Sequence, residues 1–234
     1  MHIFGYELWL IILIGLLELS LFLAFSGDML QYAARIASSL YDHPNLSTHI
    51  ASLCMLINRI GAAIALMIIG YMIDSGFSAK LITEIYAIFS LILSFSYLFL
   101  YKNGYIFLFY AKKAIVKYYG VEISSTSMRS DFIQTKIKYD IAVVYVVSLL
   151  GFFFPSVAAA YFTQFKATLL QSGFILNSFA TLYFALVVEK RMALTLNDGS
   201  IPDKLQMFSE FMLARFCGSF FTSVSFYVLS LSAF

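Results

Sequence analysis

Two arginines and one glutamate interrupt long apolar stretches of the sequence, and these are the residues best suited to do chemistry. Arg59 lies within Ala51–Ile73, Arg215 lies near the start of Phe208–Leu231, and Glu18 belongs to the first apolar stretch. A charge inside a bilayer is costly unless it faces protein, water or a counter-ion. Because a guanidinium matches the geometry of phosphate oxygens, the two arginines are candidates for binding an anion such as a phosphate. A structural ion pair of Arg59 or Arg215 with Glu18 or Glu210 is the simpler alternative.

Residue counts from the ends of the apolar stretches place these three charges at similar depth. Arg59 and Arg215 follow the start of their stretches by about eight and seven residues, or roughly 10–12 Å of helix. Glu18 precedes the end of its stretch by about the same distance. We therefore predict that the three side chains approach one another or share one cavity.

Two more charged residues lie nearer the membrane surface than this predicted layer. Asp28 and Arg35 follow the first apolar stretch, closer to the same membrane surface, and their spacing of seven residues puts them on one face of a helix. Asn177, on a polar side of the fifth stretch, is a further candidate for substrate binding, although hydrogen bonding between helices is its commoner role. The predicted substrate-binding residues are Glu18, Asp28, Arg35, Arg59, Asn177 and Arg215.

The composition indicates an integral membrane protein. Of the 234 residues, 61% are hydrophobic and only 12% are charged, whereas soluble domains carry roughly 25% charged residues. The apolar stretches are long and well separated, which predicts an all-α polytopic helix bundle and not a barrel of short alternating strands. The chain is expected to form a single membrane domain over residues 1–234. Its predicted spans are Phe4–Phe25, Ala51–Ile73, Leu81–Leu100, Ile141–Tyr161, Thr168–Val188 and Phe208–Leu231.

The connection between the third and fourth spans, residues 101–140, carries most of the remaining positive charge. Its first part, Tyr105–Tyr119, is aromatic and contains three lysines, which predicts a helix at the membrane surface. The part Gly120–Asp131 is polar and is expected to be mobile. Eleven lysines and arginines fall on this side of the six-span arrangement, against Lys80 and Lys166 on the other. The excess predicts that residues 101–140 are cytoplasmic and that both termini lie outside.

Small residues suggest where helices pack closely. Ala158–Ala160 on the fourth span and Gly218, Ser219 and Ser223 on the sixth form such surfaces. Six packed helices leave little room for a large substrate. Either two copies enclose the path as a homodimer, or a monomer buries these surfaces between its own helices and opens a lateral groove beside Arg59.

The sequence lacks the common catalytic motifs. It contains no H-E-x-x-H, no G-x-S-x-G and no glycine-rich phosphate loop, and its three histidines fall outside the spans. We therefore expect no catalytic residue, metal or cofactor. The two cysteines lie in apolar stretches and are interpreted as packing residues. The net charge of +2 gives no reason to expect a nucleic-acid partner.

Four motifs in order along the chain are similar to those of one known family. Asp28–Ala37 resembles the D-x-L-x-Y-x-x-R-x-A signature of the Amj ("alternate to MurJ") lipid II flippases. Arg59 followed by Gly70 and Asp74 resembles the pattern of that family's second span. The run Thr168–Ala193 and the pair Arg215–Gly218 resemble motifs of its last two spans. Asn58 and Glu189-Lys190 depart from the family pattern, so the chain resembles a divergent member.

This resemblance implies a function. Amj proteins move undecaprenyl-pyrophosphate-linked disaccharide-pentapeptide from the inner to the outer leaflet of the bacterial cytoplasmic membrane, for peptidoglycan assembly, cell-wall organisation and cell shape. The lipid is then the expected partner. Two other functions remain open: a small-solute or ion transporter that uses the same charge layer, and a non-transporting cell-envelope assembly factor in which Arg59 and Arg215 tolerate neutral replacement.

Overall fold

A computed structural model describes residues 2–39, 44–119, 139–198 and 200–232. This part of the chain is helical with no strand, which confirms the all-α prediction. Six of its helical segments are long and apolar enough to cross a membrane, so the protein is a multi-pass membrane protein. The elements are α1 (His2–Ser39), α2 (Pro44–Asp74), α3 (Ala79–Tyr119), α4 (Tyr139–Tyr161), the short 3-10 helix η1 (Thr163–Phe165), α5 (Lys166–Tyr183), the π-helix η2 (Phe184–Glu189), α6 (Lys190–Asp198) and α7 (Ile201–Ser232).

The helices extend beyond the predicted spans at the end of the bundle that carries the charged residues. The predicted first span ends at Phe25, but α1 continues to Ser39, and α7 begins at Ile201 instead of Phe208. At 38 residues α1 is about 57 Å long, well beyond a hydrocarbon core of about 30 Å. Hydropathy falls at Asp28 and Arg35, but α1 continues past both residues. Their side chains face the interior of the bundle.

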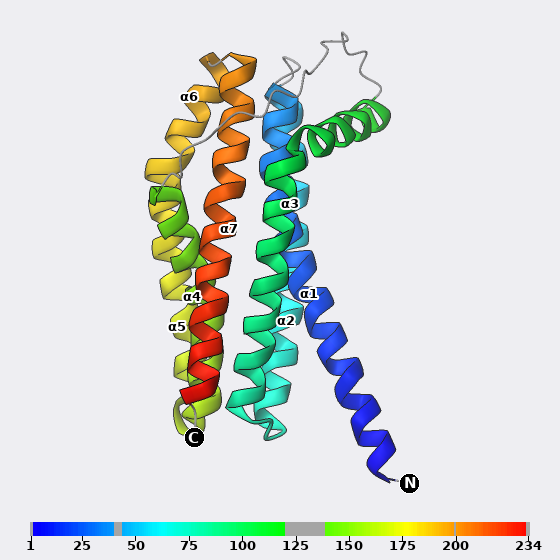
Figure 1. Cartoon of the computed structure of the whole chain (residues 1–234), viewed down its shortest axis with the longest axis vertical. Coiled ribbons are helices and arrows are strands. Elements are labelled where there is room, and N and C mark those ends of the chain that lie inside the picture. The colour runs from blue at the N-terminus through cyan, green and yellow to red at the C-terminus, as the bar shows by residue number, and fades with distance from the viewer. Residues whose placement is uncertain (1, 40–43, 120–138, 199, 233–234) are drawn as a thin grey trace.

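The bundle is built from closely packed helix pairs. Helix α1 packs along α2, α3 along α7, and α4 along α5, and α4 also contacts α7 (Figure 1). Glycines permit the close approach: a Cβ on Gly61 of α2 would lie 2.5 Å from the backbone nitrogen of Ala24 in α1. Likewise, a Cβ on Gly173 of α5 would lie 2.9 Å from the carbonyl oxygen of Gly151 in α4. Small residues at these contacts are the usual means of helix association in lipid.

The third long helix changes direction where the predicted span ends. Asn103 has non-helical backbone angles (φ −119°, ψ 22°), and the aromatic ring of Phe208 packs against the adjacent Gly104. Beyond this kink α3 continues to Tyr119 and leaves the bundle at a steep angle (Figure 1). The predicted helix Tyr105–Tyr119 is therefore present, and its location at the membrane surface stays a prediction. The predicted mobile stretch Gly120–Asp131 lies outside the described residues.

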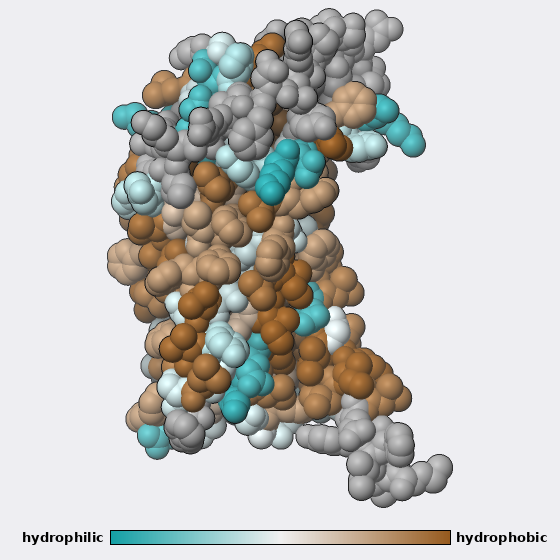
Figure 2. All heavy atoms as spheres, viewed as in Figure 1, coloured by the Kyte–Doolittle hydropathy of each residue, from teal (hydrophilic) through white to brown (hydrophobic). Residues whose placement is uncertain are grey.

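The exterior of the bundle suits a membrane. Large apolar side chains are exposed along it, among them Ile11, Met67 and Phe95. Figure 2 shows that hydrophobic residues dominate the middle of the visible face, with hydrophilic side chains toward the end where α3 bends away and a few more in the lower half. The two ends of the chain lie at the opposite end of the bundle (Figure 1), as an even number of crossings requires.

The small-residue surfaces are used inside the chain. Ala159, Ser219 and Ser223 are almost completely buried, and the Ser223 hydroxyl donates a hydrogen bond of 2.7 Å to the Ala87 carbonyl of α3. These residues are thus not available to a second copy. These surfaces therefore give no support for a homodimer, which stays a prediction that rests on the size of the substrate. The first condition set for a monomer, burial of the small residues between its own helices, is met.

Candidate functional site

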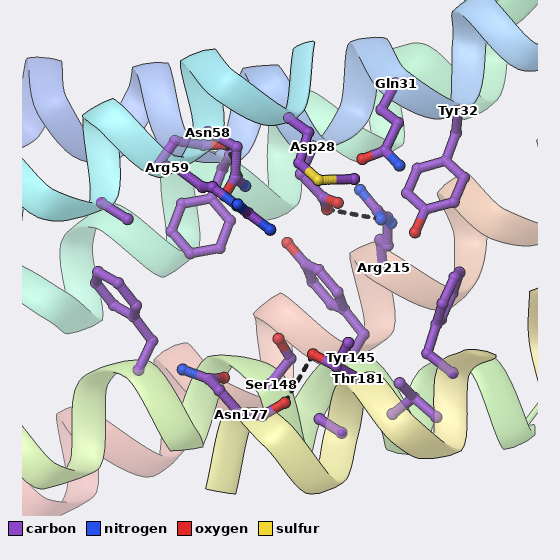
Figure 3. A pocket seen from close by; sticks show the side chains of 18 of the residues that line it. Asp28, Gln31, Tyr32, Asn58, Arg59, Tyr145, Ser148, Asn177, Thr181 and Arg215 are labelled. Carbon is purple, nitrogen blue, oxygen red and sulfur yellow. Dashed lines mark hydrogen bonds and ion pairs between the residues drawn. The ribbon is translucent and has the colours of Figure 1, made fainter. Parts of the chain in front are cut away.

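A cavity of about 470 Å³ lies between the α1–α2 pair and the α4–α5 pair, with α7 closing one side (Figure 3). It falls within the range of roughly 300–1,000 Å³ that small-molecule sites occupy. Three arginines and two carboxylates line it, together with uncharged polar side chains from four helices. The charged residues are Asp28, Arg35, Arg59, Glu189 and Arg215, and the uncharged polar residues are Gln31, Tyr32, Asn58, Tyr145, Ser148, Asn177 and Thr181.

Arg215 of α7 is enclosed by protein. Its side chain is 4% exposed, and its Nη2 atom lies 2.7 Å from Oδ2 of Asp28 in α1. The guanidinium carbon lies 4.6 Å from the ring centre of Tyr32 and 5.0 Å from that of Tyr145. Aromatic faces attract a cation in this arrangement, and a buried charge requires such compensation. The carboxylate and the rings therefore hold Arg215 in place.

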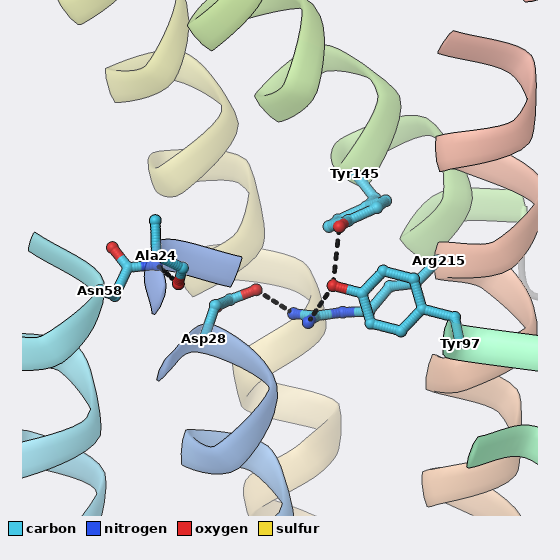
Figure 4. A network of polar contacts seen from close by, with 6 residues as sticks. All are labelled: Ala24, Asp28, Asn58, Tyr97, Tyr145 and Arg215. Atoms are coloured by element: carbon cyan, nitrogen blue, oxygen red, sulfur yellow. Dashed lines mark hydrogen bonds and ion pairs between the residues drawn. The ribbon is translucent and has the colours of Figure 1, made fainter. Parts of the chain in front are cut away.

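A hydrogen-bond chain extends this cluster to α3 and α4 (Figure 4). Nη1 of Arg215 donates to the Tyr97 hydroxyl at 3.5 Å, and that hydroxyl lies 2.8 Å from the hydroxyl of Tyr145. Since Asp28 is on α1, the contacts of Arg215 join four helices. This cluster fixes one wall of the cavity.

A second ion pair lies along the cavity. Nη1 of Arg35 in α1 donates to Oε1 of Glu189 at 2.7 Å. Glu189 is the last residue of η2, the π-helical segment that follows α5. Segments of π-helix contain one extra residue in a turn and occur frequently at functional sites. The pair thus connects α1 to the irregular part of the fifth span.

Arg59 differs from the other two arginines of the cavity because it has no partner among the described residues. It makes no hydrogen bond or ion pair within the described part of the chain, and Figure 3 shows its side chain extending into the cavity. The preceding residue, Asn58, donates from Nδ2 to the Ala24 carbonyl at 2.8 Å and anchors this turn of α2 to α1. Since Asp28 pairs with Arg215 and Glu189 with Arg35, the excess positive charge of the cavity resides on Arg59.

Gln31 adds an uncharged polar group to the same space. The residue is 9% exposed, lines the cavity and makes no hydrogen bond to any other described residue. Its amide can both donate and accept hydrogen bonds. A bound molecule therefore meets a free cation at Arg59 and a free amide at Gln31, one from each helix of the α1–α2 pair.

Five of the six predicted site residues line this cavity: Asp28, Arg35, Arg59, Asn177 and Arg215. The prediction that Arg59 and Arg215 share a cavity is confirmed. Asn177 lies at its edge, with its side-chain oxygen close to Gly151 of α4.

Glu18 is the exception, because it is not among the lining residues, and Arg215 pairs with Asp28 in place of Glu18 or Glu210. The depth count assumed that α1 leaves the membrane at Phe25. Measured from its observed end at Ser39, Asp28 lies about 16 Å and Glu18 about 31 Å along α1. Arg215 lies about 21 Å from the start of α7 at Ile201, so Asp28 is the carboxylate at its level.

Sequence reasoning missed the aromatic residues around Arg215 and the amide of Gln31. Tyrosines are common in membrane proteins as interfacial residues, and nothing in the spacing of Tyr97 and Tyr145 separates them from that role. Tyr32 was visible only as part of the Asp28–Ala37 signature.

No protein-family model, curated protein or solved structure matches this chain. The resemblance to the Amj flippases therefore rests on the motifs quoted above.

Proposed function

We propose that the protein is a transporter of an anionic lipid-linked molecule, namely a lipid II flippase of the bacterial cytoplasmic membrane. The observation that carries this proposal is the unpaired Arg59, which extends into a cavity with an excess positive charge between membrane-spanning helices. Arg59 is exposed, and within the described residues no carboxylate offsets its charge. A cation within a membrane-spanning helix is unfavourable without a counter-ion. An anionic ligand relieves that cost, so the site favours an anion over a neutral or cationic molecule.

The geometry suits a diphosphate. A guanidinium donates two parallel hydrogen bonds to phosphate oxygens, and the amide of Gln31, which lines the same cavity, supplies a further donor. A cavity of about 470 Å³ has room for the diphosphate and adjoining atoms. A disaccharide-pentapeptide is much larger than that, so the rest of the head group extends beyond the cavity during transport.

The size of the cavity also favours a second candidate, a transporter of small anions. A free anion of a few atoms fits entirely within 470 Å³, whereas lipid II does not. The two functions differ in their substrates. A small-anion transporter moves soluble anions in liposomes and leaves the distribution of lipids unchanged.

The decisive experiment uses cells in which the main lipid II flippase is depleted. Expression of the wild-type chain is expected to restore lipid II at the cell surface. Arg59→Gln is expected to abolish this restoration at an equal level of protein in the membrane. Lys80→Gln, which removes an exposed charge in the first turn of α3, serves as the matched control and is expected to restore fully. Failure of the wild-type chain at a verified membrane level rejects the flippase.

A further inference from the structure

Residues 104–119 of α3, beyond the kink, form an arm that projects from the bundle (Figure 1). The part of α3 that is apolar enough to cross a membrane ends at Gly104, which is where the arm begins. The arm leaves the span at a steep angle (Figure 1), so it runs more nearly along a bilayer surface than across the bilayer. A helix in this position is suited to the headgroup layer.

One side of the arm is packed against the protein. Leu108 is 1% exposed, and Phe107 and Ala111 are partly buried against the hydrophobic core. The ring of Phe107 stacks on the ring of Phe208 in α7, with 6.4 Å between the ring centres. These contacts fix the rotation of the arm about its own axis, so the same set of side chains is always presented on the opposite side.

The exposed side of the arm combines apolar, aromatic and basic side chains. They occupy positions i, i+3, i+4, i+7 and i+11 of the helix, which lie on one face, and they are Ile106, Phe109, Tyr110, Lys113 and Lys117. Phe109 and Tyr110 are 46% and 63% exposed. Nζ of Lys113 lies 4.7 Å from the ring centre of Phe109, so the ammonium group and the ring are presented together.

This combination of side chains fits the surface of an anionic bilayer. Exposed rings are unfavourable in water, and ammonium groups are costly in hydrocarbon. At the headgroup layer the rings enter the boundary of the acyl chains while the ammonium groups meet phosphates. Residues 104–119 contain three lysines and no aspartate or glutamate, so nothing within the arm offsets its positive charge. Each lysine near an anionic surface strengthens association by about fivefold.

We infer that the exposed face of the arm binds the headgroups of anionic phospholipids, in the leaflet at the end of the bundle where α3 bends. The arm follows directly after a membrane span, which keeps this face within reach of lipid. Its uncompensated positive charge is complementary to the negative surface potential of such a leaflet. This role does not depend on the molecule that the charged cavity binds.

The test places one tryptophan on the arm of the full chain in nanodiscs. The sequence contains a single tryptophan, Trp9, so Trp9→Phe with Tyr110→Trp leaves one reporter on the exposed face. The nanodiscs contain phosphatidylcholine and phosphatidylglycerol in a fixed proportion, and only one of the two is brominated in each sample, near the headgroup end of its acyl chains. Bromine quenches tryptophan fluorescence at short range. At equal bromine content, brominated phosphatidylglycerol is expected to quench this reporter at least twofold more than brominated phosphatidylcholine.

The matched control is Phe95→Trp in the same Trp9→Phe background. Phe95 is 60% exposed on the same helix but lies about two turns before the kink, so both lipids should quench it equally. Lys113→Gln with Lys117→Gln should reduce the quenching ratio at the Tyr110 reporter to one. Lys113→Arg with Lys117→Arg keeps the charge and should preserve the ratio. Unchanged quenching of the Phe95 reporter in each lysine variant verifies that the bundle is intact.

A ratio of one at the Tyr110 reporter with both lysines present would overturn the inference, because the arm would then not select anionic lipid. Weak quenching by both lipids would overturn it as well, since this face would then be turned to water or to a protein partner. A high ratio that survives the two glutamine replacements would contradict the role of the lysines. None of these readings depends on transport, so such a failure leaves the flippase proposal to its own test in cells.

Discussion

The carboxylate of Asp28 lies 2.7 Å from the guanidinium of Arg215 and joins the first and last helices of the bundle. Arg215 is 4% exposed and Asp28 is 25% exposed, so the pair is buried on one side and reaches the cavity on the other. Three tyrosine rings complete the enclosure of the cation. Arg215 thus supports the site, while Arg59 remains free to bind.

Replacing Asp28 is expected to destabilise the protein. Asp28→Asn leaves the buried Arg215 without its counter-ion, and breaking such a pair costs about 3 kcal/mol, the lower end of the usual range because Asp28 is partly exposed. Thermal unfolding in detergent measures the loss. The double replacement Asp28→Asn with Arg215→Gln is expected to recover part of it, because no uncompensated charge remains. Equal stability of the wild type and Asp28→Asn would contradict this role.

Replacing Arg59 is expected to weaken ligand binding and to leave the stability of the protein nearly unchanged. Arg59→Gln removes no hydrogen bond or ion pair within the described residues, so the melting temperature should change by no more than a few degrees. Binding of inorganic pyrophosphate, measured by calorimetry, should fall at least tenfold, since a charge-assisted hydrogen bond contributes about 1.5–3 kcal/mol. Arg59→Lys keeps the positive charge but lacks the paired N–H donors of the guanidinium, so it should retain only part of the binding. A large loss of stability with unchanged binding would assign Arg59 a structural role instead.

The pair Arg35–Glu189 is expected to contribute little to stability. Its side chains are 22% and 42% exposed, and pairs of this kind contribute about 0–1 kcal/mol. Glu189→Gln should therefore lower the free energy of unfolding by less than about 1 kcal/mol. It leaves a second unpaired cation, Arg35, in the cavity, so pyrophosphate should bind more tightly. The charge exchange Arg35→Glu with Glu189→Arg should restore wild-type binding, and unchanged binding in Glu189→Gln would be evidence against the pair's electrostatic role.

Close packing of α1 on α2 can be tested with two glycines of the same helix. A Cβ on Gly61 would lie 2.5 Å from the backbone of Ala24, whereas one on Gly70 would meet nothing within 4 Å. Gly61→Ala is expected to destabilise the bundle by about 1–3 kcal/mol through overpacking. Gly70→Ala should be neutral or stabilising by about 0.5–1 kcal/mol, because alanine favours helix. Equal effects of the two replacements, measured by thermal unfolding, would show that the helices are not in this contact.

The orientation predicted from lysine and arginine counts is tested with single cysteines in a cysteine-free background. Cysteine replacing Lys113, beyond the kink of α3, should react only with cytoplasmic reagent, and cysteine replacing Lys80 only from outside. The two positions lie at opposite ends of the bundle, since one span of α3 separates them. Labelling of both from one side would reject the six-span arrangement.

Hydropathy alone was sufficient for the number of spans and for their helical structure. Stretches such as Ala51–Ile73 must become helices, because a backbone in lipid has to satisfy its own hydrogen bonds. The cost of a charge in hydrocarbon likewise required Arg59 and Arg215 to face something polar. These two inferences depend on local composition, so no knowledge of neighbouring helices was needed to identify the arginines as site residues.

The pairing of those charges was decided by tertiary structure. Whether Asp28 or Glu18 lies opposite Arg215 depends on how far α1 continues beyond Phe25, and it continues to Ser39. The enclosure of Arg215 needs Tyr32, Tyr97 and Tyr145, which come from three other helices. The packing between helices, including the close contacts at Gly61 and Gly173, sets the rotation of each helix about its axis. That packing also leaves Arg59 as the unpaired cation, because it brings a carboxylate to each of the other two arginines in the cavity.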